Sequence, residues 1–267
     1  SPDGWEYVIY LKRHEEARAP WIYVLANENF GCIVSERGSS YTWKENAHEF
    51  RLTPWSNDPV TDSSGEAVYI RDEESGKFWS PTPGPARSAL PYLIRHGFGY
   101  SVFEHLSEGI ESRLWVYVAK EAPVKFYRLK LANKSGRRRT LSATGYVEWV
   151  LGDLCSKHAM HISTEPERSR GAIFAKNPYP IDFPGKIAFF DVNLPDRTIT
   201  GDRLEFIGRN GSTAKPEAMG RTSLSGRTGP GFDPCGAIHT VVALAPGEER
   251  ELVFVLGAAN NADEAQS

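Results

Sequence analysis

The stretch that decides the fold is Val124-Lys-Phe-Tyr-Arg-Leu-Lys-Leu131, in the middle of the chain. Its second half alternates between apolar side chains and the basic residues Arg128 and Lys130, which is the two-residue period of a β-strand with one buried face. The polar turn Asn133-Lys-Ser-Gly136 follows, and residues 139–150 form a second apolar stretch. This arrangement predicts a β-hairpin at the centre of the fold.

A second hairpin is predicted near the end of the chain, from residues 237–244, a turn at Ala245-Pro-Gly-Glu-Glu249 and a return through residues 251–256. Both faces of the returning strand carry apolar side chains, which predicts that this strand lies between two layers. Further strands are expected earlier in the chain, at residues 6–12, 22–26, 30–35, 67–71 and 114–119.

Helical periodicity is hard to find, because 24 Gly and 18 Pro residues interrupt the chain. Short strands joined by tight turns are typical of all-β proteins. We therefore predict an all-β fold, a large antiparallel β-sandwich with few short helices, over residues 1–258. The polar, alanine-rich residues 259–267 are predicted to begin a linker helix.

The composition argues against several classes of protein. The 267 residues carry 31 Lys and Arg against 34 Asp and Glu, and this weak negative balance argues against a nucleic-acid groove. No apolar run approaches the roughly 20 residues of a membrane helix, so no direct membrane insertion is expected. The three cysteines are far apart and lack the spacing of zinc or redox sites, which predicts three separate thiols in a reducing cytoplasm.

Residues 41–105 combine aromatic side chains with Asn, Asp, Arg and Glu throughout. A sugar ring needs this combination, since its apolar face packs on an aromatic ring while amides, carboxylates and guanidinium groups bind its hydroxyls. The same residues also suit a protein–protein interface. A third interpretation is structural: Asn57-Asp58-Pro59 forms a turn, Arg71 and Asp72 form an ordinary ion pair, and the tryptophans fill the core.

Two histidines in His158-Ala-Met-His161 have the spacing of neighbouring metal ligands on a helix. No nearby group completes a metal site by its spacing, with Glu148 and Asp153 as the only guesses, so a solvated loop is the preferred interpretation. Motifs for phosphate-binding loops, nucleophilic serines and zinc-dependent hydrolases do not occur in the sequence. We predict neither a metal nor a cofactor.

A series of short blocks resembles one known family in its order and spacing. The blocks are Ala19-Pro-Trp-Ile-Tyr-Val-Leu-Ala-Asn27, Phe30-Gly31 with Ser35-Glu36, Tyr41-Thr-Trp43, Leu52-Thr-Pro-Trp-Ser-Asn-Asp-Pro59, Tyr69-Ile-Arg-Asp72, Trp79-Ser-Pro-Thr82, His96-Gly-Phe-Gly-Tyr-Ser101, Glu148-Trp-Val-Leu-Gly152 and Asp233-Pro-Cys235. The series is similar to the N-terminal sandwich of family 94 glycoside hydrolases, which are inverting phosphorylases such as cellobiose and chitobiose phosphorylase. Within that family it most resembles the C-terminal region of cyclic β-1,2-glucan synthases, and the resemblance covers nearly the whole chain.

The resemblance implies an antiparallel super-sandwich of the galactose-mutarotase-like type. In the family this domain precedes an (α/α)6 barrel that holds the general-acid aspartate and the phosphate pocket. The chain begins at Ser1 and none of its carboxylates matches that acid by motif, so we expect a piece of a longer polypeptide. The implied role is a non-catalytic carbohydrate-binding or scaffold domain in the cytoplasm, from a parent anchored in the inner membrane. Its implied partners are the catalytic barrel, a weakly bound β-glucan oligosaccharide and a second copy in a homodimer.

The resemblance also places loops near the sugar site. Such loops fall at residues 41–59, 69–82 and 95–101, and no residue in them is assigned a catalytic role. The candidate sugar-contacting side chains in these loops are Trp43, Trp55, Asn57, Asp58, Arg71, Asp72, Trp79, Arg95, His96 and Tyr100.

Two alternatives stay open. A self-sufficient enzyme of the mutarotase type would use His96 with Glu104 or Glu148 as acid and base. A pure interface module would have no affinity for sugars. If a barrel packs on the sandwich in a longer protein, a large apolar patch should be exposed on this chain.

Overall fold

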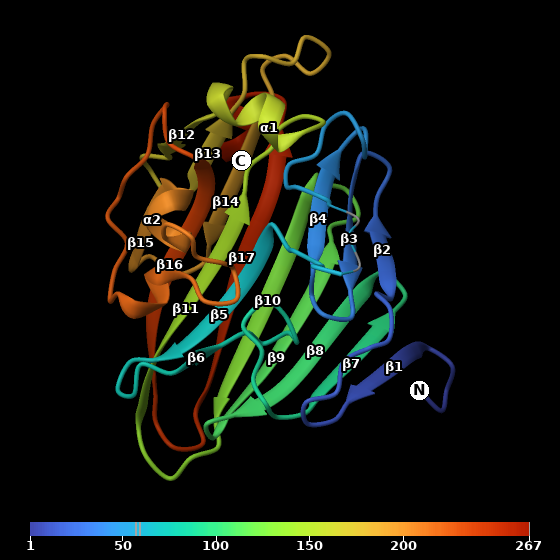
Figure 1. Cartoon of the computed structure of the whole chain (residues 1–267), viewed down its shortest axis with the longest axis vertical. Helices are drawn as coiled ribbons and strands as arrows, with labels where there is room; N and C mark the ends of the chain where they lie inside the picture. The colour runs from blue at the N-terminus through green and yellow to red at the C-terminus, as the bar shows by residue number, and fades with distance from the viewer. Residues whose placement is uncertain (57, 59, 267) are drawn as a thin grey trace.

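The computed structural model describes residues 1–56, 58 and 60–266, and its strands form three antiparallel sheets (Figure 1). The nine-stranded sheet has the order β1 (Glu6–Leu11), β7 (Tyr92–Gly97), β8 (Tyr100–Ser107), β9 (Ile110–Val118), β10 (Val124–Asn133), β17 (Glu249–Ala259), β14 (Ile187–Val192), β13 (Ile173–Lys176) and β12 (Ser163–Pro166). The five-stranded sheet has the order β15 (Arg197–Asp202), β16 (Pro234–Leu244), β11 (Arg139–Glu148), β5 (Glu66–Asp72) and β6 (Phe78–Trp79). The three-stranded sheet is β2 (Ile22–Ala26), β3 (Phe30–Ser35) and β4 (Ser40–Lys44).

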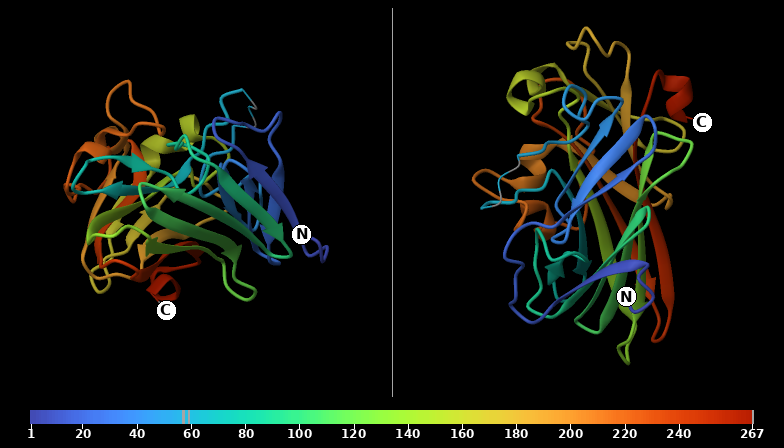
Figure 2. Two further views of the ribbon diagram at one scale, coloured as in Figure 1. Left: turned by 90° about the horizontal axis from the view of Figure 1, so that it is seen from below. Right: turned by 90° about the vertical axis from the view of Figure 1, so that its right-hand side faces the viewer.

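The nine-stranded sheet is one layer of a sandwich, and the two smaller sheets lie next to each other in the second layer (Figure 2). Inward side chains of both layers form one hydrophobic core. Its fully buried members include Phe103, Leu129 and Phe254 from the large sheet and Cys32 and Ile70 from the smaller sheets. The predicted all-β class, with an antiparallel sandwich, is confirmed.

The helices of the described residues are short, as the sequence predicts. They are α1 (Cys155–His158), α2 (Arg203–Ile207), α3 (Ala262–Gln266) and the 3-10 helices η1 (Ala159–His161) and η2 (Glu217–Gly220). In α3, Ala262 and Ala265 pack against the cluster of Phe174 and Ile187 on the outer side of the nine-stranded sheet (Figure 2). No helix in the described ranges is both long and apolar enough to cross a membrane.

Both predicted hairpins are wrong in their pairing, although their strands form. β10 pairs with β9 and β17, whereas β11 pairs with β16 and β5. β16 and β17 likewise belong to different sheets, so each turn carries the chain from one layer to the other. Alternation identifies the buried face of a strand and not its neighbour, and strands on opposite sides of one core show the same pattern.

These two crossings between layers are joined by Asn133, which is fully buried at the end of β10. Its side-chain amide donates to the carbonyl groups of Arg137 at 2.8 Å and of Leu244 and Ala245 at 3.1 Å. Its backbone amide donates to the carbonyl of Glu248 at 3.0 Å. One side chain therefore fixes both turns relative to each other.

An ion pair is buried between the layers. The Nζ atom of Lys125 in β10 lies 2.6 Å from Oε2 of Glu66 in β5, and the two side chains are 0% and 1% exposed. The hydroxyl groups of Thr42 and Thr53 donate to Oε1 of Glu66 at 2.7 and 2.5 Å, and Tyr127 donates to the same carboxylate. Burial works to raise the pKa of Glu66, but Lys125 and the hydroxyl donors outweigh it and lower the pKa, so the carboxylate stays charged.

Candidate functional site

Strand β4 turns polar side chains inward and aromatic side chains outward. The hydroxyls of Ser40 and Thr42 contact the buried ion pair, whereas Tyr41 and Trp43 alternate with them on the opposite face of the strand. The Trp43 ring lies over the backbone of Gly31 in β3, where an added Cβ would come within 2.4 Å of the ring. Gly31 therefore lets the indole lie directly on the sheet.

Trp55 and Arg51 complete an aromatic cluster around Tyr41. The centroid of the Tyr41 ring lies 5.3 Å from that of Trp43 and 5.1 Å from that of Trp55. The guanidinium carbon of Arg51 lies 5.7 Å from the Tyr41 centroid, within the range of a cation–π contact. Tyr41 is buried, but Trp43, Trp55 and Arg51 are half-buried, so part of each indole is available to a ligand.

Beside Trp55 the surface is hollowed into two adjoining depressions, which we call the Trp55 groove. Their volumes are about 210 and 240 Å³, and Asp62 and Ser63 line both of them. The other residues of the first depression are Pro20, Ile22, Trp55, Ser56 and Asp58. The other residues of the second depression are Arg37, Ser39, Thr61, Ser64, Gly84, Pro85, Ser212, Thr213 and Ala214.

Asp62 and Arg37 meet in the second depression without a hydrogen bond between them. Oδ2 of Asp62 lies 3.8 Å from Nε of Arg37, which is too long for a hydrogen bond, and the side chains are 10% and 30% exposed. Neither of these two atoms has a hydrogen-bond partner in the part of the chain that the structure describes. A hydroxyl group both donates and accepts, so a sugar hydroxyl between them would satisfy both atoms.

Asp58 has a different role at the other end of the groove. Its Oδ1 atom accepts a hydrogen bond from the amide of Val60 at 2.9 Å, and its Oδ2 atom accepts from the hydroxyl of Thr61 at 2.8 Å. The bond from the Val60 amide, followed by that from Thr61, lowers the pKa of Asp58. The carboxylate is therefore charged and holds the loop in place, with lone pairs remaining for a ligand.

The candidates in the second predicted loop have structural partners. Arg71 pairs with Glu73 at 2.6 Å, and Asp72 forms a buried ion pair with Arg139. Trp79 is 3% exposed and belongs to the hydrophobic core. Arg139 is itself buried, so this ion pair belongs to the interior of the fold.

The candidates in the third predicted loop lie on two faces of the nine-stranded sheet. Arg95 and Tyr100 both bind Glu6, at 3.1 and 2.8 Å, on the outer face. His96 has the opposite parity and is buried on the inner face. None of these residues lines the Trp55 groove.

His96 meets neither of the carboxylates considered as its catalytic partner. Its Nδ1 atom is bonded to the hydroxyl of Ser101 at 2.8 Å, its ring stacks on Tyr23 at 5.4 Å, and burial lowers its pKa. Glu104 pairs with arginines on the outer face, and Glu148 belongs to the five-stranded sheet. In the described part of the chain, neither Glu104 nor Glu148 therefore forms an acid–base pair with His96.

The structure thus brings together three of the candidates, Trp43, Trp55 and Asp58, while Asn57 lies outside the described residues. Sequence reasoning missed Arg37 and Asp62. Asp62 carried a weak signal as an acid in the loop after Trp55, but nothing in the sequence predicts that residues 212–214 fold against it.

His158 is buried, so the interpretation of its motif as a solvated loop is wrong at this residue. Its Nε2 atom contacts Asp153 at 2.5 Å and its Nδ1 atom contacts Asn177 at 3.0 Å. Burial works to raise the pKa of Asp153, but the hydrogen bonds from His158 and Lys157 outweigh it and lower the pKa to about 2. Among the described residues there is no group of three or more His, Cys, Asp or Glu side chains arranged to hold a metal ion.

An exposed aromatic patch lies along the edge strands β1 and β2. Trp5, Tyr7 and Trp21 are 65%, 58% and 57% exposed. The Tyr7 ring lies 6.1 Å from Trp21, and the Trp5 ring lies 5.9 Å from Phe98. The patch reaches the Trp55 groove through Ile22, which is 53% exposed and lines its first depression.

A family model described as "Glycosyl hydrolase 94, supersandwich domain" matches residues 5–267. The chain is 38% identical over 270 residues to the cyclic beta-(1,2)-glucan synthase NdvB of Rhizobium meliloti (strain 1021), covering 100% of the chain and 10% of that relative. It is 30% identical over 265 residues to the N,N'-diacetylchitobiose phosphorylase of Vibrio proteolyticus, covering 96% of the chain and 32% of that relative. The chain spans from about a tenth to about a third of the length of these relatives.

Solved structures share the fold at low sequence identity. A galactose mutarotase-like protein from Lactobacillus casei ATCC 334 superposes with a TM-score of 0.50 at 10% identity, covering 90% of this chain and 100% of that one. A bacterial glucoamylase in complex with acarbose superposes with a TM-score of 0.51 at 7% identity, covering 98% of this chain and 37% of that one. The predicted galactose-mutarotase-like sandwich is confirmed by these likenesses.

Proposed function

The chain belongs to the glycosyl hydrolase 94 supersandwich domain family, and from this membership we propose that it is a non-catalytic carbohydrate-binding and scaffold domain of a larger glucan synthase or glycoside phosphorylase. Its relatives include a cyclic beta-(1,2)-glucan synthase and an N,N'-diacetylchitobiose phosphorylase, each much longer than this chain. We propose a β-glucan oligosaccharide as the ligand and the Trp55 groove as its site.

The unsatisfied contact between Asp62 and Arg37 is the observation that supports this site. Two buried polar atoms without partners are costly in a folded protein unless a ligand or solvent bonds to them. Trp55, at the other end of the groove, offers an aromatic surface for the apolar face of a sugar ring. The groove is open and small, so we expect weak binding that orients a glucan and does not enclose it.

We propose that the aromatic patch around Trp5, Tyr7 and Trp21 packs against the catalytic barrel of a longer polypeptide. Large exposed aromatic side chains that touch one another are typical of interfaces, whereas single exposed apolar residues are not. Residues 1–258 would then be the sandwich, and residues 259–267, which include α3, would begin the linker to the barrel. We further propose a homodimer and a cytoplasmic location for this domain.

Titration with β-1,2-linked glucooligosaccharides, followed by NMR and tryptophan fluorescence, tests the ligand and the site. We expect a dissociation constant of roughly 0.1 to 10 mM, as for a small and hydrated contact. Trp55→Ala and Asp62→Asn should each weaken binding about tenfold, since a hydrogen bond to a charged group or a stacked ring contributes about that much. Trp115→Ala is the control, because Trp115 lies away from the groove between Arg113 and Arg128.

The titration also distinguishes a sugar-binding domain from a pure interface module that has no affinity for sugars. If tens of millimolar oligosaccharide change no signal of the groove residues, the domain is an interface module and the sugar site is wrong. If binding survives both groove substitutions and is lost with Trp115→Ala, the chain binds sugar on the outer face of the nine-stranded sheet and the proposed site is wrong.

A further inference from the structure

A pocket of about 640 Å³, which we call the α3 pocket, lies on the outer face of the nine-stranded sheet beside helix α3. Its walls come from residues 121–123 between β9 and β10, from the turn between β12 and β13, and from α3 itself. Its volume falls within the roughly 300 to 1,000 Å³ of ligand pockets and exceeds that of either depression of the Trp55 groove. The two sites share no lining residue, so the α3 pocket is a separate candidate site.

The register of the strands explains the apolar floor of this pocket. Phe126 of β10, Val255 of β17 and Asp191 of β14 are direct neighbours across three strands, so their side chains lie on one face. Two residues away along each strand, a second row on the same face consists of Val124, Gly257, Phe189 and Phe174. Both rows supply lining residues, so three phenylalanine side chains contribute to the pocket.

Gly257 lets one of these rings lie on the sheet. A Cβ at this position would come within 2.4 Å of Cζ of Phe189, so the Phe189 ring occupies the space above the glycine. On the neighbouring strand, the Phe126 ring stacks on Tyr117 with their centroids 5.1 Å apart. Phe126 and Phe189 are half-buried, so each keeps part of its ring surface available to a ligand.

Negative charge predominates around the α3 pocket. Four carboxylates and one guanidinium group line it, those of Glu121, Glu167, Asp191, Glu264 and Arg170. Asp191 pairs with Arg197, and Glu167 accepts a hydrogen bond from the backbone amide of Arg170 at 2.6 Å. Even when Arg197 is counted, four negative charges stand against two positive ones. Glu121 is exposed and has no hydrogen bond or ion pair with any other described residue, so its carboxylate is free to bind a ligand.

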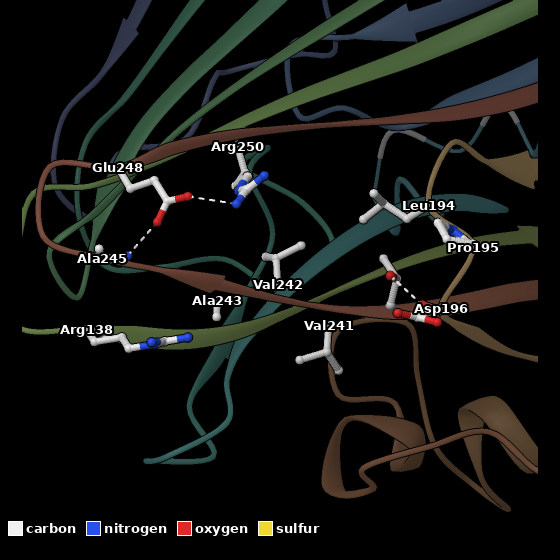
Figure 3. Close-up of a pocket in the computed structure, with 11 residues that line it drawn as sticks. Arg138, Leu194, Pro195, Asp196, Val241, Val242, Ala243, Ala245, Glu248 and Arg250 are labelled. Carbon is white, nitrogen blue, oxygen red and sulfur yellow. Dashed lines mark hydrogen bonds and ion pairs between the residues drawn. The ribbon is translucent and has the colours of Figure 1, made fainter.

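Another hollow, beside β16, has a different composition (Figure 3). Its volume is about 360 Å³, and its lining within the described residues contains no aromatic side chain. Its charges are balanced, with Arg138 and Arg250 against Asp196 and Glu248. The combination of aromatic rings with an excess of negative charge therefore distinguishes the α3 pocket from this hollow.

We propose that the α3 pocket binds a small ligand with an apolar body and an ammonium group. The face of an aromatic ring attracts a cation, and rings beside a carboxylate are typical of sites that recognise alkylated ammonium groups. The apolar body would lie on Val255 and Phe189, and the ammonium group would lie toward Glu121. This proposal does not depend on the sugar site, which is built from other residues.

NMR titration of the chain with two probes of opposite charge tests the proposal. Hexyltrimethylammonium and hexanesulfonate carry the same apolar chain, so a difference between them reports the charge preference of the pocket. We expect a dissociation constant of roughly 0.1 to 10 mM for the ammonium probe, with shifts at residues of the pocket. The sulfonate should bind about tenfold more weakly or not at all. A sulfonate that binds as tightly as the ammonium probe overturns the proposal, as does the absence of any shift in the pocket at tens of millimolar ammonium probe.

Substitutions in the pocket give a second test. Glu121→Gln should weaken binding of the ammonium probe about threefold to fivefold, the effect of one solvent-screened charge. Glu28→Gln is the matched control, because Glu28 is also exposed, has no partner among the described residues and does not line the pocket. An equal loss in both variants would show general attraction to an acidic surface and would overturn the proposed site.

Filling the floor tests the location without changing a charge. Val255→Trp should weaken binding of the ammonium probe more than tenfold, because the indole occupies the space between Phe126 and Asp191. Circular dichroism checks that this variant is folded, and the exposed Glu121→Gln decides the matter if it is not. Unchanged binding in Glu121→Gln and in folded Val255→Trp overturns the proposal. Neither substitution changes the Trp55 groove, so oligosaccharide binding there should stay as in the wild type.

Discussion

The two faces of β4 reverse the usual pattern of a strand in a sandwich. The inner face carries the hydroxyls of Ser40 and Thr42, which bond to the buried pair of Lys125 and Glu66. The outer face carries aromatic rings, with Tyr41 at the centre of the aromatic cluster. Polar groups are therefore inside and rings are outside, opposite to the alternation expected of a half-buried strand.

The difference between the faces lies in whether their polar groups are satisfied. On the inner face, hydroxyl groups and Lys125 bond to both oxygens of Glu66, so the network is complete and holds three strands together. Next to the outer face, Asp62 and Arg37 are 3.8 Å apart and keep atoms without partners. The comparison teaches that a complete buried network points to architecture, whereas an incomplete one at the surface points to a ligand.

Breaking the inner network should have the largest effect on stability. Lys125→Met leaves the Glu66 carboxylate buried without its cation, and we expect the free energy of unfolding to fall by about 3 to 5 kcal/mol. Chemical denaturation monitored by tryptophan fluorescence measures this loss.

A double variant separates the charge from the packing. Lys125→Met combined with Glu66→Gln removes both charges but keeps an acceptor for the hydroxyls of Thr42 and Thr53, so it should recover at least about 1 kcal/mol relative to Lys125→Met alone. If Lys125→Met costs less than about 1 kcal/mol, the pair does not hold the layers together as described.

A substitution on the outer face of β4 should lower the stability less than breaking the inner network does, but it should weaken oligosaccharide binding. Gly31→Ala places a Cβ within 2.4 Å of the Trp43 ring, which must move, and we expect a loss of about 1 to 3 kcal/mol from the free energy of unfolding. The displaced indole should also weaken oligosaccharide binding severalfold, measured by the same NMR titration.

Gly136→Ala is the matched control for this substitution. Among the described residues, no heavy atom outside Gly136 and its two chain neighbours lies within 4 Å of a Cβ placed at Gly136, and its backbone does not have a positive φ. We expect a change of less than about 1 kcal/mol and unchanged binding. If the two alanine variants show the same stability and the same binding, the Trp43 ring does not need a glycine at position 31 beneath it.

Much of the fold can be predicted from short-range sequence pattern, and the parts that could not be predicted have a physical reason. Strands β2 and β3 match the predicted residues 22–26 and 30–35, because their ends are marked by turns and by changes in polarity. The predicted pairing of β10 with β11 was wrong because, in sequence, a turn that joins two strands of one sheet resembles a turn that crosses between layers. β4 was not predicted as a strand, since its inward residues are Ser40 and Thr42.

The site was harder to predict, because contact across the fold decides it. Trp55 and Asp58 could be found from an aromatic residue beside polar ones. Asp72 has a similar composition around it, yet a distant Arg139 encloses it in an ion pair. The second wall of the groove comes from residues 212–214, which are fixed by the bond from the Tyr69 hydroxyl to the Thr213 carbonyl at 2.7 Å. Such long-range partners leave no local pattern.

The smallest effect on stability is expected from a solvent-exposed ion pair whose length is close to that of the buried pair of Lys125 and Glu66. Arg128 and Glu251 are 2.7 Å apart on the outer face of the nine-stranded sheet, close to the distance of the buried pair, but their side chains are 44% and 40% exposed. Glu251→Gln should change the free energy of unfolding by less than about 1 kcal/mol, since water screens both charges. Arg128 also keeps its contact with Trp115, whose ring centroid lies 5.1 Å away.

Salt concentration separates the two pairs further. Raising it should reduce the small loss of unfolding free energy caused by Glu251→Gln, whereas it should leave the loss caused by Lys125→Met nearly unchanged in chemical denaturation. A cost for Glu251→Gln as large as that for Lys125→Met would show that distance, and not the completeness of the surrounding network, sets the strength of these pairs.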